Sequence, residues 1–140
     1  MGDVAVYQRY LDKLVPARDA LESAELGIEA AYRAKQVEVH RLRDEKRREA
    51  RMAYATACRA AVKEETELAQ SQMLQAATDV YLAAIKGAFD EAERELASAR
   101  AEMVANLARV RARYEVVHEA AKEEAGAVFG EKGDETREVA

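Results

Sequence analysis

Apolar residues recur every three or four positions along the second half of the chain. Between Ile85 and Ala121, ten such steps span 36 residues, a mean of 3.6. This spacing places the side chains on one face of a continuous α-helix, and a mean of 3.6 predicts little supercoiling. Most other positions hold charged residues, Gln or Ala, which suit a solvent-exposed face. The series is Leu74, Ala77, Tyr81, Ile85, Phe89, Ala92, Leu96, Ala99, Met103, Leu107, Val110, Tyr114, Val117 and Ala121.

A short amphipathic helix is predicted for residues 1–15. Asp3 is a suitable N-cap, and Pro16 disfavours the helical conformation at the residue before it while suiting the first turn of a new helix. Because Pro16 separates this segment from the longer helix that follows, we expect its apolar face to dock another protein. The alternative is that the face packs back on the rest of the molecule. Its residues are Val4, Tyr7, Leu11 and Leu14.

The first half of the chain carries an interrupted apolar pattern. Apolar spacing continues from Leu14 to Leu42, stops at the charged heptad 43–49, resumes at Ala50 and fades at residues 63–67. The heptad is interpreted as a solvated helix with pairs such as Asp44 and Arg48, or alternatively as a turn. A chain reversal is predicted within residues 66–72, with Thr66 or Ser71 as the helix cap.

Two all-α architectures fit this pattern. The first is a long antiparallel helical hairpin, similar to a coiled coil, over residues 16–126, followed by a flexible charged tail at 127–140. The second is a three-helix bundle with breaks near 45–50 and 87–90. The hairpin is favoured because a reversal near residue 70 brings a basic segment opposite an acidic one, and such flanking pairs fix helix register. The basic residues are Lys46, Arg47, Arg48 and Arg51, and the acidic ones are Asp90, Glu91, Glu93 and Glu95.

Alanine dominates the apolar residues. The chain of 140 residues contains 31 Ala, whereas Leu, Ile, Val and Phe together number 27. Alanine favours the helix but adds little volume to a core. Since the net charge is only −5 and the apolar residues are regularly spaced, the composition predicts an ordered protein with a thin core. No pocket for a small-molecule substrate is evident from such a core.

Composition disfavours several classes of function. Cys58 is the only cysteine, so no internal disulfide can form, which is typical of a reducing, cytoplasmic setting. No apolar run approaches the length of a membrane span, and no signal-peptide pattern is present. A pI of about 5.2 argues against nucleic-acid binding by the chain as a whole. Because phosphate-loop, zinc and nucleophile motifs are lacking, the sequence indicates no enzyme activity and no cofactor.

A basic segment is the candidate site for a polyanion such as nucleic acid. Residues 33–51 carry eight basic and four acidic side chains, a local net charge of +4. Lysine and arginine side chains bind phosphates, but the interspersed acidic residues favour a solvated helix face. The candidate polyanion-binding residues are Arg41, Arg43, Lys46, Arg47, Arg48 and Arg51.

One pair of residues has the spacing of a metal-binding motif. Glu115 and His118 lie three positions apart, which places a carboxylate and an imidazole on one helical face, as in di-metal carboxylate bundles. The only other histidine, His40, has Val37 in place of the required acid. A metal-binding bundle is therefore the weakest of the three hypotheses, and a surface pair is the simpler interpretation.

The pattern as a whole favours a non-enzymatic structural or interaction protein. We expect a helical spacer or assembly subunit, of bacterial or phage origin, that forms a homo-oligomer or docks a protein partner in the cytoplasm or within a virion or other assembly. No membrane partner is expected. The candidate interaction residues are Val4, Tyr7, Leu11, Leu14, Leu96, Met103, Leu107, Val110, Tyr114 and Val117.

Overall fold

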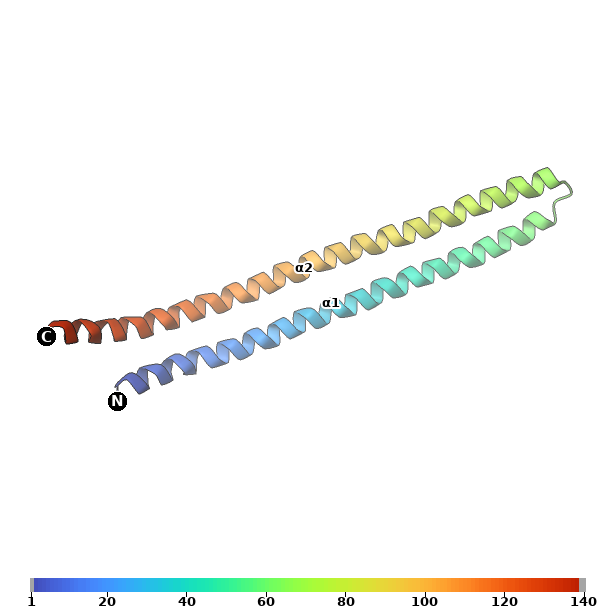
Figure 1. The fold of residues 1–140 in the computed structure, drawn as a ribbon. Helices are drawn as coiled ribbons and strands as arrows, with labels where there is room; N and C mark the ends of the chain where they lie inside the picture. Colours follow the sequence, from blue (N-terminus) through green and yellow to red (C-terminus); the bar gives the residue numbers. More distant parts are fainter. Residues whose placement is uncertain (1, 139–140) are drawn as a thin grey trace. The chain divides into compact units, whose positions relative to one another are not determined.

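The chain folds as a hairpin of two long helices. The computed structural model describes residues 2–138, including the side chains of residues 2–127. Within this range the elements are α1 (Gly2–Val62) and α2 (Glu67–Glu138), with no strand. Figure 1 shows α2 returning antiparallel to α1 after a short connection. The predicted helical hairpin is confirmed. The three-helix alternative is wrong, because the helices continue through residues 45–50 and 87–90.

Two compact units divide the hairpin. The turn unit, Tyr32–Ala101, contains the connection between the helices. The terminal unit consists of Met1–Ala31 and Glu102–Ala140. Each unit therefore combines a segment of α1 with the antiparallel segment of α2, and each is described below by itself.

The reversal occupies residues 63–66, slightly before the predicted range of 66–72. The Lys63 amide donates to the Ala60 carbonyl at 3.2 Å and tightens the last turn of α1. Thr66 is the N-cap of α2, since its Oγ1 accepts a hydrogen bond from the Ala69 amide at 3.1 Å. The Gln70 side chain donates a hydrogen bond to the Glu64 carbonyl at 2.8 Å, which links the connecting residues to the first turn of α2. Of the two predicted caps, Thr66 is therefore the correct one, and Ser71 lies inside the helix.

α1 is continuous through Pro16, so the separate helix predicted for residues 1–15 is not a distinct element. The proline ring holds φ near the helical value, and its main cost is the loss of one hydrogen bond to the carbonyl of Asp12. Both residues are exposed, so water can reach that carbonyl. An exposed position makes the proline tolerable within the helix.

α2 extends to Glu138, beyond the start of the tail predicted for residues 127–140. Glycine ends a helix most readily when it takes a left-handed conformation, and no glycine in the described range has a positive φ. The backbone of residues 127–138 is accordingly helical. Residues 139–140 of the predicted tail lie outside the described range.

The buried side chains of the turn unit are almost all alanine. Val39, at 2% exposure, is the largest fully buried side chain among the described residues. Small residues let two helix backbones approach closely, which explains why alanine fills the seam between α1 and α2. The buried residues of the turn unit are Val39, Ala50, Ala61, Ala77, Ala88 and Ala92. In the terminal unit, Ala121 is buried.

Most residues of the apolar series of α2 face α1, whereas Leu74, Phe89 and Val117 are exposed. In the turn unit, Ala77 and Ala92 are buried and Tyr81, Ile85, Leu96 and Ala99 are half-buried. Ala88 takes the inward position where the series predicted Phe89, whose ring is instead 40% exposed. An aromatic ring does not fit a seam spaced for alanine, and the neighbouring position supplies the smaller side chain.

Candidate interaction surfaces

The predicted interaction residues of the terminal unit fall into two groups. Val4 and Tyr7 are 73% and 58% exposed, and Val117 is also exposed. The others are half-buried on the inward side of the helices and are less accessible to a partner. These half-buried residues are Leu11, Leu14, Met103, Leu107, Val110 and Tyr114. Leu96, which belongs to the turn unit, is half-buried as well.

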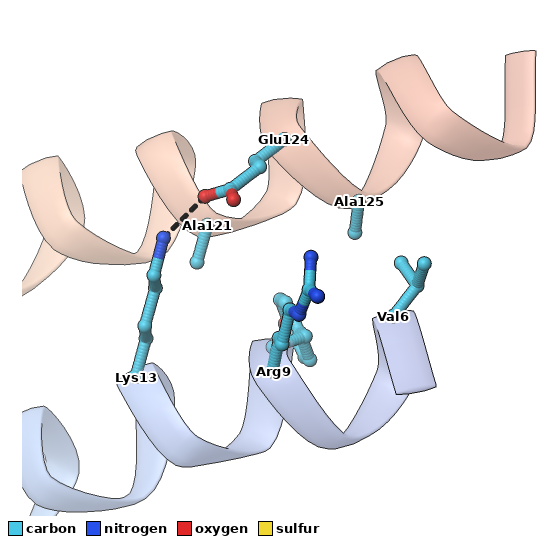
Figure 2. Close-up of a pocket in the computed structure, with 7 residues that line it drawn as sticks. Val6, Arg9, Lys13, Ala121, Glu124 and Ala125 are labelled. Atoms are coloured by element: carbon cyan, nitrogen blue, oxygen red, sulfur yellow. Dashed lines mark hydrogen bonds and ion pairs between the residues drawn. The ribbon is translucent and has the colours of Figure 1, made fainter. Parts of the chain in front are cut away.

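Charged residues cross from α1 to α2 in the terminal unit. Lys13 forms an ion pair with Glu124, and the Arg111 Nη2 atom lies 3.0 Å from Glu25 Oε2. The hydrogen bond from Lys13 is the main reason that the pKa of the Glu124 carboxyl is lowered. Figure 2 shows the Lys13–Glu124 pair at one side of a small hollow. Arg9 and Val6 line the hollow from α1, the helix that carries Lys13. These contacts orient the two helical segments of this unit.

Aromatic residues surround His118 in the terminal unit. Its Nε2 atom lies 3.4 Å from the Tyr10 hydroxyl, and its ring stacks on Tyr114 with centroids 5.8 Å apart. The Tyr7 and Tyr10 rings also stack, with their centroids 6.4 Å apart. A hollow of about 350 Å³ opens beside this cluster and is lined by Tyr7, Tyr10 and His118 among others. Tyr7 and Tyr114 were predicted on apolar helix faces, whereas the contacts of Tyr10 and Tyr114 with His118 were not predicted.

The Glu115–His118 pair gains a third potential ligand in the structure. Glu115, His118 and Glu119 offer atoms that all lie within 4.8 Å of one another. The three residues come from one turn of α2, and both glutamates are exposed. Three donors from a single helix are fewer than the four of a closed structural zinc site. The i,i+4 spacing of Glu115 and Glu119 in the sequence places both carboxylates on the same helical face as His118.

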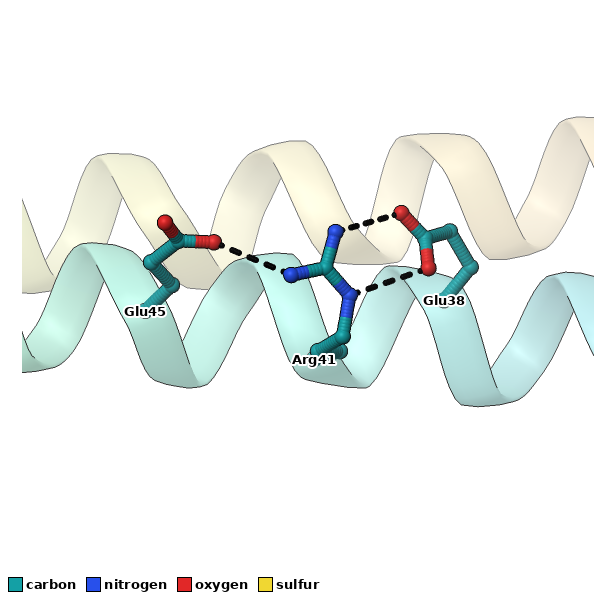
Figure 3. Close-up of polar contacts among 3 residues, drawn as sticks. All are labelled: Glu38, Arg41 and Glu45. Carbon is teal, nitrogen blue, oxygen red and sulfur yellow. Dashed lines mark hydrogen bonds and ion pairs between the residues drawn. The ribbon is translucent and has the colours of Figure 1, made fainter.

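The basic segment of the turn unit is largely paired with acidic side chains. Arg41 Nε and Nη2 donate to the two carboxylate oxygens of Glu38 at 3.0 and 2.8 Å, and Nη1 donates to Glu45 at 3.2 Å (Figure 3). The hydrogen bond from Arg41 is the main reason that the pKa of the Glu38 carboxyl is lowered. Lys46 forms an ion pair with Glu91 on α2. This cross-helix pair joins the basic and acidic segments that the sequence predicted to face each other.

Two further arginines of this segment contact an aromatic ring. The guanidinium carbons of Arg43 and Arg47 lie 5.1 and 5.5 Å from the centroid of the Phe89 ring, within the range of cation–π attraction. Asp44 Oδ1 also lies 3.3 Å from Arg43 Nη2 and 3.7 Å from Arg47 Nη1. The predicted pairing of Asp44 with Arg48 is replaced by these contacts. In the described part of the chain, no ion pair involves Arg48 or Arg51.

An apolar groove of about 470 Å³ runs along the turn unit between α1 and α2. We call it the alanine groove. From α1 it is lined by Ala53, Ala57 and Ala60, and from α2 by Met73, Val80 and Ala84, with Tyr54 and Tyr81 between them. The rings of Tyr54 and Tyr81 lie 5.1 Å apart. This groove was not predicted, although its residues recur at helical spacing in both segments.

None of the described helices contains an apolar stretch that could cross a membrane. Comparison of the chain with protein-family models, with curated proteins and with solved structures finds no match.

Proposed function

We propose that this chain is a non-enzymatic structural protein, a helical spacer or assembly subunit that self-associates or docks a protein partner through its apolar surfaces. The observation that carries the proposal is the distribution of apolar side chains. Among the described side chains, the buried ones are alanines and Val39, whereas larger apolar side chains such as Val80 are exposed. An isolated folded chain normally buries its larger apolar side chains.

The energetics of the seam support the same conclusion. Burial of one methyl or methylene group contributes about 0.8 kcal/mol, so each buried alanine adds little. Ordering the backbone of one residue costs about 1–2 kcal/mol. Helices of this kind gain much of their stability from packing of an apolar face, and association with another surface would add such packing.

Several exposed apolar residues are available for this packing. On α1 they include Val37, Met52 and Val62, and on α2 they include Leu68, Val80 and Leu82. In the terminal unit, Val4 and Tyr7 remain candidates for docking, as the sequence predicted. The two ends of α1 thus both present apolar side chains to a second molecule.

The test is the dependence of mass and thermal stability on protein concentration. Light scattering after gel filtration gives the mass, to be compared with 15.5 kDa for one chain. Circular dichroism gives the unfolding midpoint, which rises with concentration when folding is coupled to association. We expect a multimer and a rising midpoint. A chain that stays at 15.5 kDa with a constant midpoint over a hundredfold concentration range would contradict self-association.

The polyanion alternative has less support. Arg41, Arg43, Lys46 and Arg47 contact acidic side chains of the same chain, and each of these contacts competes with a phosphate. Only Arg48 and Arg51 of the six predicted residues show no such contact among the described residues.

A further inference from the structure

His118 lies against two aromatic residues of the terminal unit. Its Nε2 atom is 3.4 Å from the Tyr10 hydroxyl on α1, and its ring stacks on Tyr114, one turn earlier in α2. The side chain is half-buried, so these neighbours limit its rotation. Because Nε2 faces Tyr10, Nδ1 is the ring nitrogen that is left to bind another group.

Two carboxylates lie beside this imidazole on α2. Glu115 precedes His118 by three residues, and Glu119 follows Glu115 by four. The potential ligand atoms of the three residues all lie within 4.8 Å of one another. Zinc binds nitrogen and carboxylate oxygen atoms at about 2.0–2.2 Å, so the ligands of one ion lie somewhat closer together than this. Both glutamates are exposed, and their side chains can turn to close the remaining distance.

In the part of the chain that the structure describes, neither carboxylate pairs with a basic side chain. Arg111, one turn before Glu115, instead pairs with Glu25 at 3.0 Å. Lys122, in the next turn, lines the hollow beside His118. Like charges four positions apart on a helix repel each other, and a divalent cation between the two carboxylates would remove that repulsion.

We propose that Glu115, His118 and Glu119 bind one Zn²⁺ ion. In this site Nδ1 of His118 is the nitrogen ligand, and the protonated Nε2 donates a hydrogen bond to the Tyr10 hydroxyl. Three protein ligands leave a position open for water, unlike a closed structural zinc site. Two carboxylates and a neutral imidazole balance the charge of the ion. The imidazole selects zinc over Mg²⁺, which prefers oxygen ligands and retains several waters.

Tyr10 links the site to α1. A histidine that binds a metal almost always donates its other ring N–H to a neighbouring acceptor, which fixes the ring and its tautomer. Tyr10 supplies that acceptor from α1, whereas the three ligands come from α2. Zinc binding should therefore strengthen the contact between the two helical segments of the terminal unit. The three ligands belong to none of the apolar surfaces in the proposed function, so this inference goes beyond that function and does not depend on it.

The first measurement is isothermal titration calorimetry of the full chain, without an affinity tag, against ZnCl₂ at pH 7. We expect one Zn²⁺ per chain. His118→Ala should weaken binding at least about tenfold, since a ligand contributes no less than the residues that support it. His40→Ala is the matched control, because His40 is an exposed histidine with Val37 in place of the acid, and it should leave the affinity unchanged. MgCl₂ should give no comparable binding.

The carboxylate ligands are tested by exposed substitutions that disturb no packing. Glu115→Gln and Glu119→Gln should each weaken zinc binding, because a neutral amide replaces a charged ligand. Glu123→Gln is the control, since Glu123 is an exposed glutamate of the same helix outside the cluster. Circular dichroism confirms that all variants remain helical, and zinc should raise the thermal midpoint of the original chain more than that of either ligand variant.

The role of Tyr10 is tested by removing its hydroxyl. Tyr10→Phe keeps the ring and should weaken zinc binding roughly tenfold. Tyr7→Phe is the control, because the Tyr7 ring stacks on Tyr10 and its hydroxyl has no part in the proposed site. Nitrogen-15 NMR of the imidazole identifies the bound atom, and we expect zinc on Nδ1 with a proton on Nε2 of His118.

The outcomes decide between the site and its alternatives. One Zn²⁺ per chain, weakened by the ligand variants and unchanged in His40→Ala and Glu123→Gln, supports the inference. An absence of zinc binding, equal weakening by His40→Ala and His118→Ala, or similar affinity for Mg²⁺ overturns it. Zinc on Nε2 overturns the assigned nitrogen ligand and the role of Tyr10. The proposed function is tested by mass in the absence of zinc, so the two failures are distinguishable.

Discussion

The Lys46 ammonium group on α1 forms an ion pair with the Glu91 carboxylate on α2. The pair crosses the seam of the turn unit, with both side chains a little less than half exposed. The hydrogen bond from Lys46 is the largest cause of a lowered pKa at the Glu91 carboxyl. An ionic contact between elements therefore favours the charged form of this glutamate in the folded state.

This ion pair should make stability depend on pH in the acid range. Because the folded-state pKa of Glu91 lies below its ordinary value of 4.5, the contribution is complete above that value and is lost as the pH falls through the lowered pKa. We expect Glu91→Gln to lower the thermal midpoint by a few degrees at most at pH 7, and to have a smaller effect as the pH falls through the acid range. Thermal unfolding at several pH values tests this, with Glu93→Gln as the control. An equal effect of both substitutions at pH 7 would argue against a specific role for the pair.

Truncation of Val39 should be the most costly deletion of a valine side chain in α1. Its side chain is 2% exposed, so Val39→Ala removes two buried carbons and leaves a cavity, at a cost of about 2 kcal/mol in the free energy of unfolding. Val37, two residues away, is 69% exposed, and Val37→Ala should change this free energy by less than about 0.5 kcal/mol. Urea denaturation measures both. Similar values for the two variants would contradict the burial pattern.

The cap of α2 gives a third prediction. Thr66→Ala removes the acceptor of the Ala69 amide and should destabilise the chain by about 1 kcal/mol. Thr66→Ser keeps the hydroxyl oxygen and should retain most of the stability. The midpoint of urea denaturation distinguishes the two variants. If serine is as harmful as alanine, the capping hydrogen bond is not the source of the effect.

Replacement of Pro16 should stabilise α1. Pro16→Ala restores an amide that can donate to the Asp12 carbonyl, and alanine is favoured over proline by up to about 3 kcal/mol inside a helix. The neighbouring exposed substitution Val15→Ala is the control. We expect higher helicity and a higher thermal midpoint for Pro16→Ala alone. A lower midpoint would indicate that the proline is needed for a bend or a boundary at this position.

Helical spacing was sufficient to predict the fold but not the ends of its elements. The regular series through Ile85, Ala92 and Ala121 predicted a continuous helix across Gly87, and α2 is continuous there. The break expected at Pro16 is absent because the cost of one lost hydrogen bond depends on solvent access, which local sequence does not reveal. The helix end expected near Gly126 is also absent. The backbone conformation of this glycine decides whether the helix ends there, and local sequence does not reveal that conformation.

The surfaces were harder to predict than the helices. The contact between Lys46 and Glu91 follows from charge complementarity once a hairpin is assumed. Ala88, and not Phe89, lies in the seam because the two helices pack closely. The spacing of residues along one helix does not give the distance to the other helix. The alanine groove was missed for the same reason, since a hollow is formed by two segments distant in the sequence.

The alanine-rich seam also determines how stability should respond to temperature. The heat capacity change of unfolding grows with the apolar area that becomes exposed, and alanines release little such area. We therefore expect a value per residue below the usual range of about 12–15 cal/mol/K. A small heat capacity change gives a flat stability curve, so cooling should weaken this hairpin less than it weakens a protein with a core of large side chains.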